Sequence, residues 1–194
     1  MTDWLLGLVP QYGIYLLAAA TFASCLALPV PASILMIAAG GFVATGDLSL
    51  AASSGAALAG ALAGDQAGYL VGRWGGSRLI DRLSARAEPL ASATAFLATR
   101  GGIAVFLSRW LAAALGPYVN VAAGAAGLPW LRFTLWGASG EVVWVAVYVG
   151  AGYTFSGNLA AASGMAFDVL GLLAAGAVAI GLGYWLLTAL RTER

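Results

Sequence analysis

Three ionisable side chains, Asp65, Arg109 and Glu141, lie within apolar stretches of the sequence. A charge in hydrocarbon costs on the order of 3 kcal/mol or more, so such residues normally face a bundle interior or a wet cavity and pair there. A guanidinium offers a phosphate two parallel hydrogen-bond donors, so we expect Arg109 to bind an anionic headgroup. Asp65 and Glu141 would carry protons or hold the arginine when the anion leaves. The alternative is a static arginine–carboxylate cluster that joins the halves of the protein.

Two proline-interrupted apolar segments are expected to place these groups at a cavity. Pro29 and Pro31 divide one apolar run, and Gly116-Pro117 divides a second run from Ile103 to Leu128. Proline removes a backbone donor and clashes with the preceding turn. Lipid cannot satisfy the freed carbonyls, so such backbone persists only where protein buries it or where it lines a watery cavity. Pro29, Pro31 and Pro117 are therefore predicted to open the backbone toward a substrate path.

Asn120 and a set of aromatic residues are further candidates. Asn120 follows Pro117 by three residues and is expected either to cap unwound backbone or to contact the substrate. The aromatic residues could line a lipid path, although interfacial anchoring and core packing are commoner roles; they are Tyr69, Tyr118, Trp136, Trp144 and Tyr148.

The composition is that of an integral membrane protein. The 194 residues are 61% hydrophobic and 9% charged, with a mean hydropathy of +0.90, whereas soluble domains carry roughly 25% charged residues. A net charge of +1 argues against a nucleic-acid binder. With no His and one cysteine, Cys25, the chain lacks a zinc site of the usual kind and His-based catalysis. We expect no cofactor, no enzyme nucleophile–base pair, and Cys25 as a small buried hydrophobe.

The elements expected to position the site form one all-α membrane domain over residues 1–194. Four spans of the length a bilayer needs are predicted, together with two re-entrant segments. A charge-rich loop over residues 73–100 is expected to hold a short interfacial helix, and Gly60, Gly64, Gly68 and Gly72 form a packing seam at four-residue spacing. The spans are 5–28, 48–71, 129–152 and 169–190, and the re-entrant segments are 29–43 and 103–128.

The distribution of arginine predicts the topology. The 73–100 loop, Arg132 and the Arg191–Arg194 tail are expected in the cytoplasm. The two re-entrant segments then enter from opposite faces, as in an inverted repeat. Short matches point the same way: Ala38-Ala39-Gly40 with Ala122-Ala123-Gly124, and Gly64-Asp65, Tyr69 and Gly72 with Gly140-Glu141, Tyr148 and Gly150.

Residues 64–73, GDQAGYLVGR, match a GDxxGYxxGR motif, and Phe106-Leu107-Ser108-Arg109 matches the start of an F-x-x-R motif. With the Pro29-Val30-Pro31 pair, these segments resemble the DedA family (the VTT or SNARE-associated membrane domain) from about Leu28 to Gly152. The resemblance implies two facing re-entrant loops and adds Arg73, the last motif residue, to the candidate site. Some family members are implicated in recycling polyprenyl-phosphate carrier lipids across the bacterial membrane, coupled to a cation gradient, and eukaryotic relatives scramble phospholipids.

The chain departs from the family pattern at four positions. Ser24 and Ser33 stand where the family has acidic residues around the proline pair. Ala112 stands near the place of a proline and Leu115 at that of a second arginine. The chain is therefore similar to a divergent member.

Together, these features predict a multi-pass protein of the bacterial inner membrane that translocates an anionic lipid, either a polyprenyl phosphate or a phospholipid. A proton or cation is an expected coupling partner, no nucleic acid is expected, and a homo-oligomer is left open. The alternative is a non-transporting scaffold or interaction protein with a structural arginine–carboxylate cluster.

Overall fold

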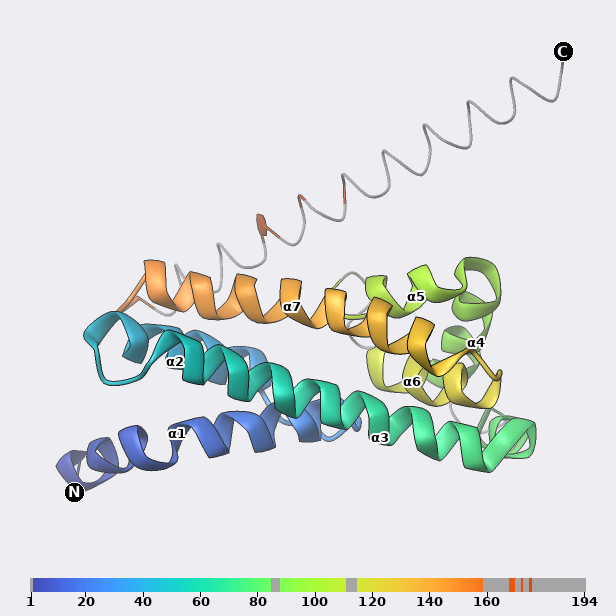
Figure 1. The fold of residues 1–194 in the computed structure, drawn as a ribbon, viewed down its shortest axis with the longest axis horizontal. Helices are drawn as coiled ribbons and strands as arrows, with labels where there is room; N and C mark the ends of the chain where they lie inside the picture. The colour runs from blue at the N-terminus through green and yellow to red at the C-terminus, as the bar shows by residue number, and fades with distance from the viewer. Residues whose placement is uncertain are drawn as a thin grey trace, which may run out of the picture.

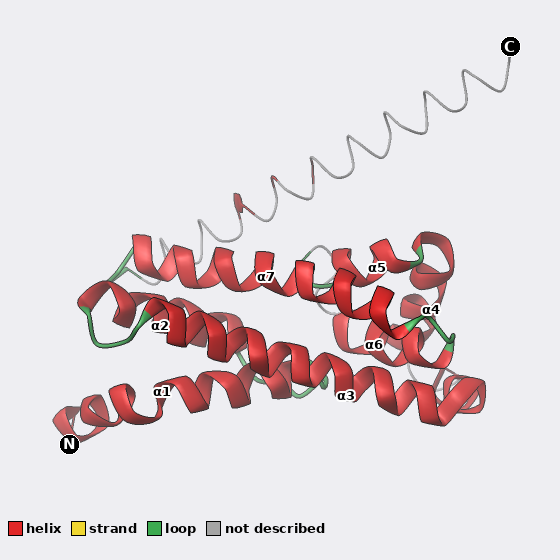
Figure 2. Ribbon diagram, in the orientation of Figure 1, coloured by secondary structure: helices red, strands yellow, loops and turns green. Residues whose placement is uncertain are grey.

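The computed structural model describes residues 2–84, 88–110 and 115–158, with isolated helical positions at 168–169, 172 and 175. Most of the predicted fourth span, 169–190, lies outside the described residues. Within the described part the secondary structure is helical throughout, without strands (Figure 2). The helices are α1 (Thr2–Ser24), α2 (Ala32–Thr45), α3 (Leu50–Ser84), α4 (Glu88–Arg100), α5 (Gly102–Leu107), α6 (Gly116–Ala125) and α7 (Trp130–Thr154).

Two helical hairpins form the centre of the fold and turn at opposite ends of the molecule. A turn through Gly46 joins α2 to α3 near the chain's N-terminus, and a turn through Gly127 joins α6 to α7 at the other end (Figure 1). Both glycines have positive φ, 85° and 71°, which other residues rarely adopt. The opposed direction of the hairpins fits the predicted inverted repeat.

Glycines bring α2 and α7 into backbone contact. A Cβ on Gly40 would collide with the carbonyl oxygen of Val149, and a Cβ on Gly152 would collide with that of Ile37. Since only glycine leaves room for this approach, the α2–α7 interface depends on these two positions.

The α6–α3 interface repeats this arrangement. A Cβ on Gly124 would meet the carbonyl oxygen of Tyr69, and a Cβ on Gly72 would meet that of Val121. Each short helix therefore packs on the long helix of the other hairpin.

The two interfaces also correspond in sequence, with offsets that differ by four residues between the short and the long helices. Gly40 and Gly124 are 84 residues apart, and Gly72 and Gly152 are 80 residues apart. The match of Ala38–Gly40 with Ala122–Gly124 is therefore mirrored in the packing. The predicted partner of Gly72, Gly150, is wrong by two residues, because Gly150 faces open space.

The predicted glycine seam lies along α3 but serves two neighbours. Gly60 and Gly64 face the backbone of Ala18 and Phe22 in α1, whereas Gly68 and Gly72 face α6. The glycine seam therefore allows both α1 and α6 to pack closely against α3.

The charged segment differs from its prediction. Residues 73–100 are not a loop with a separate short helix, because α3 continues without a break to Ser84 and α4 spans Glu88–Arg100. At about 1.5 Å per residue, the 35-residue α3 is about 52 Å long, well beyond the ~30 Å of a hydrocarbon core. Pro89 lies in the first turn of α4, where its missing N–H costs no helical bond.

Length and composition identify one helix of the described residues, Trp130–Thr154, that could cross a membrane. Two shorter apolar helices, Tyr12–Ser24 and Ala32–Thr45, accompany it. Large apolar side chains are exposed around the molecule, including Trp74 at 81% and Tyr15 at 68%. Such exposure suits a lipid-facing surface. The count of four spans stays a prediction.

Candidate functional site

Arg109 is the centre of a buried polar cluster. It follows α5 directly, in the second interrupted segment. Its Nη1 lies 3.0 Å from Oδ1 of Asp65 in α3, and its Nε lies 3.2 Å from Oε1 of Glu141 in α7. All three residues are at most 5% exposed. The structure thus brings together the three ionisable residues that the sequence singled out.

Asn120 completes the cluster from α6. Its Oδ1 accepts a hydrogen bond of 2.8 Å from Nη2 of Arg109, and its Nδ2 donates one of 3.0 Å to Oδ1 of Asp65. Nδ2 also donates at 3.5 Å to the carbonyl of Cys25, in the non-helical stretch between α1 and α2. Asn120 therefore satisfies unwound backbone, as one of its two predicted roles required, and also holds the arginine.

Glycines in the surrounding helices make room for these side chains. A Cβ on Gly140 would collide with Cγ of Arg109, and one on Gly137 would lie 3.4 Å from its Nη2. A Cβ on Gly68 would lie 2.9 Å from Cβ of Asn120. The glycine-rich faces of α3 and α7 therefore serve the charged cluster as well as helix packing.

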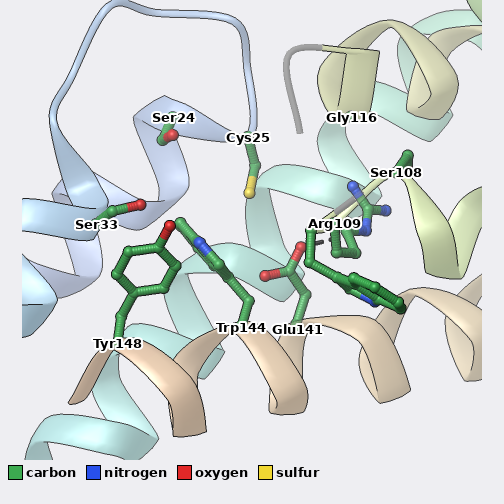
Figure 3. A pocket seen from close by; sticks show the side chains of 10 residues that line it. Ser24, Cys25, Ser33, Ser108, Arg109, Gly116, Glu141, Trp144 and Tyr148 are labelled. Carbon is green, nitrogen blue, oxygen red and sulfur yellow. Dashed lines mark ion pairs between the residues drawn. The ribbon is translucent and has the colours of Figure 1, made fainter. Parts of the chain in front are cut away.

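A cavity of about 150 Å³ opens beside Arg109, where the two interrupted segments meet (Figure 3). The first break and the start of α2 supply Ser24, Cys25 and Ser33. The second break supplies Ser108, Arg109, Trp110 and Gly116, and α7 supplies Glu141, Trp144 and Tyr148. The cavity is therefore built by the two segments that the prolines mark, together with one face of α7.

The three prolines shape the cavity without lining it. Pro29 and Pro31 are exposed, and Pro31 is the residue that precedes α2. Pro117 lies in the first turn of α6, where a proline is tolerated. Pro31 and Pro117 stand at the starts of α2 and α6, from which Ser33 and Gly116 reach the cavity.

Asp65 and Asn120 belong to the polar cluster behind the cavity wall, whereas two other predicted site residues lie outside both the wall and the cluster. Tyr69 stacks on Phe133 with ring centroids 4.6 Å apart, and its hydroxyl donates at 2.7 Å to the carbonyl of Leu128. Arg73 is exposed and lies beside Gly127 at the α6–α7 turn. Tyr69 thus ties α3 to the second hairpin, and Arg73 packs beside the turn of that hairpin.

Cys25 is the site residue that sequence reasoning missed. It is 8% exposed, as a small hydrophobe would be, but Figure 3 shows its sulfur pointing toward the Glu141 carboxylate. The Cys25 sulfur and one oxygen each of Asp65 and Glu141 lie within 4.8 Å of one another. The available signal was its position beside Ser24, where the family has an acidic residue.

The cluster carries one negative charge in excess when both carboxylates are ionised, because a single guanidinium faces them. Oδ2 of Asp65 and Oε2 of Glu141 are buried and accept no hydrogen bond from the part of the chain that the structure describes. Buried oxygens of this kind normally have a partner, so the site has capacity for a further proton, donor or cation.

Comparison with known proteins gives the same assignment as the motifs. The model of the VTT domain matches residues 30–154, which hold the second interrupted segment, all of the first but Pro29, and the cluster of Asp65, Arg109, Asn120 and Glu141. An uncharacterized membrane protein of Synechocystis is 34% identical over 130 residues, covering 65% of this chain. Uncharacterized membrane proteins of Mycobacterium bovis and Mycobacterium tuberculosis are 31% identical over 149 residues, 72% of this chain and 68% of theirs.

The chain spans 59% of the length of its Synechocystis relative. No solved structure matches significantly. The match to the family model covers well over half of the sequence and includes the motifs around Asp65 and Arg109. The chain therefore belongs to the VTT domain (DedA) family of membrane proteins.

Proposed function

We propose that the protein translocates an anionic lipid across the bacterial inner membrane, with Arg109 as the headgroup contact. The observation that carries this proposal is a buried arginine that lines a cavity formed by two proline-broken segments. Irregular backbone is tolerated at membrane depth where it lines such a cavity. The substrate would be a polyprenyl phosphate or a phospholipid.

The wall of the cavity suits a phosphate. The helices α2 and α6 begin there, so their positive dipole ends favour an anion. Ser24, Ser33 and Ser108 add side chains with hydroxyl groups. A cavity volume of about 150 Å³ leaves room for a phosphate group. The alkyl chains would stay in the lipid.

During translocation, Arg109 would exchange its carboxylate partners for the phosphate of the lipid and back again. In this structure Asp65, Glu141 and Asn120 hold the guanidinium. An incoming phosphate would compete with the carboxylates for the same donors, and the carboxylates would recapture the arginine when the phosphate leaves. A proton or cation that neutralises a carboxylate would favour the phosphate-bound state, which supplies a route for coupling.

A structural role of the cluster is the second candidate. Each nitrogen of the Arg109 guanidinium lies within 3.2 Å of a protein oxygen, as in a cluster that only fixes helices in place. The protein would then be a non-transporting scaffold or interaction protein.

A charge-neutral variant separates the two candidates. Arg109→Gln, Asp65→Asn and Glu141→Gln together remove every charge and keep similar shapes and hydrogen-bonding groups. We expect this triple variant to fold and to lose translocation of a fluorescent phospholipid or polyprenyl phosphate in proteoliposomes. Arg100→Gln, which removes an exposed cation, serves as the control. Translocation by the triple variant at the wild-type rate would contradict a headgroup role for Arg109.

A further inference from the structure

Cys25, Asp65 and Glu141 form a second potential site inside the same cluster. Cys25 comes from the non-helical stretch between α1 and α2, Asp65 from α3 and Glu141 from α7. Only tertiary packing brings the three together. One possible ligand atom of each lies within 4.8 Å of the other two. All three residues are more than nine-tenths buried.

The unpartnered oxygens point to a ligand. Among the described residues, no donor forms a hydrogen bond with Oδ2 of Asp65 or Oε2 of Glu141, whereas Oδ1 and Oε1 face Arg109. Each carboxylate thus has one oxygen engaged by the arginine and one free. A ligand that used the free oxygens would leave both ion pairs intact.

The donor set selects the chemical class of that ligand. Calcium takes six to eight oxygens and magnesium an octahedral shell, so one sulfur and two carboxylates suit neither. A thiolate with carboxylates suits a borderline divalent cation of the zinc type. Such an ion would neutralise the cluster. The thiolate and the two carboxylates carry three negative charges, and the guanidinium and the divalent ion carry three positive charges. The absence of histidine excludes only the usual His-containing sites.

We propose that Cys25, Asp65 and Glu141 bind one zinc-type divalent cation, with a water at a fourth position toward the cavity. Ligand atoms on a tetrahedral ion of this kind lie about 3.5 Å apart, given metal–sulfur and metal–oxygen distances of ~2.3 and ~2.0 Å. From 4.8 Å, a side-chain adjustment of about an ångström closes the site. Cys25 and Glu141 both line the cavity, which provides the entry path.

Cobalt(II) absorption of the purified, metal-free full chain tests the site. The chain has a single cysteine, so a thiolate-to-cobalt charge-transfer band reports Cys25 and no other residue. We expect one Co²⁺ per chain with this band, a higher Tm on binding, and displacement of Co²⁺ by Zn²⁺. Binding without a thiolate band, or no binding, would overturn the proposal.

Matched variants locate the ligands. Cys25→Ser is expected to abolish the band, and Glu141→Gln to weaken Co²⁺ binding by about tenfold or more. Ser24→Ala, which changes a neighbouring cavity residue, should keep both the band and the affinity. Equal Co²⁺ affinity in wild type and Cys25→Ser would contradict the assignment. The readout involves no lipid, so its failure and a failure of lipid translocation are distinguishable.

Discussion

At the scale of single residues, the groups around Arg109 offset one another's free-energy cost of burial. A charge is expensive to bury, and a second or third buried group is tolerated because each satisfies the others. Asn120 is central to this balance, since it accepts from Arg109 and donates to Asp65. Removing one member would leave the remaining charges buried without compensation.

Arg109→Gln alone is therefore expected to destabilise the fold by about 3–5 kcal/mol, because it leaves two carboxylates facing each other without a cation. Adding Asp65→Asn and Glu141→Gln should recover most of that loss. Reversible unfolding in mixed micelles measures both. A single variant as stable as wild type would show that the carboxylates are already neutral in the fold.

Tyr69 allows a sharper separation of structure from function. Tyr69→Phe removes the hydrogen bond to the Leu128 carbonyl but keeps the stack on Phe133. The expected loss of unfolding free energy is about 1 kcal/mol, with unchanged translocation per folded molecule. A large change in lipid selectivity at equal stability would place Tyr69 on the substrate path after all.

At the scale of elements, two glycine pairs define how the hairpins cross. Gly40 with Gly152 and Gly72 with Gly124 each sit where one backbone touches another. The register is the same in both interfaces, because each glycine lies against the carbonyl three residues before its partner glycine. The site lies between the two interfaces along the long helices, because Asp65 precedes Gly72 by seven residues in α3 and Glu141 precedes Gly152 by eleven in α7.

The helix α7 supplies a matched test of these contacts. Gly152→Ala would push a methyl group into the Ile37 carbonyl, whereas Gly150→Ala meets nothing within 4 Å. We expect Gly152→Ala to cost about 1–3 kcal/mol by overpacking and Gly150→Ala to be neutral or to stabilise by up to ~1 kcal/mol through helix propensity. Thermal unfolding in detergent compares the two. Equal effects would mean that the α2–α7 contact is looser than described.

At the scale of the whole molecule, the hairpins turn at opposite ends (Figure 1), and the arginine distribution predicts that those ends lie on opposite sides of the membrane. The α2–α3 turn would face the periplasm and the α6–α7 turn the cytoplasm. Such an arrangement lets both broken segments reach the cavity from different faces.

Single cysteines placed in a Cys25→Ala background check this orientation. Asp47→Cys and Ala126→Cys put a thiol in the two exposed turns. A membrane-impermeant thiol reagent added to intact spheroplasts should label residue 47, and residue 126 only after lysis. Labelling of both from one side would contradict opposed hairpins.

The sequence by itself determined the membrane class, the two broken segments and the three charges at their centre. The physical reason is that a buried charge or an open carbonyl is so costly in lipid that its presence implies a partner. The family motifs around Asp65 and Arg109 added the expected facing loops. These inferences require residue types and spacing, but no knowledge of how a helix is rotated.

Only the tertiary structure decided which residues meet. It brought Cys25 beside two carboxylates, placed Asn120 between Arg109 and Asp65, and left Pro29 and Pro31 outside the cavity wall. It also extended α3 to Ser84. Such outcomes depend on helix rotation and register across distant segments, set by close glycine contacts such as Gly72 on Val121. A local pattern does not encode which backbone lies opposite.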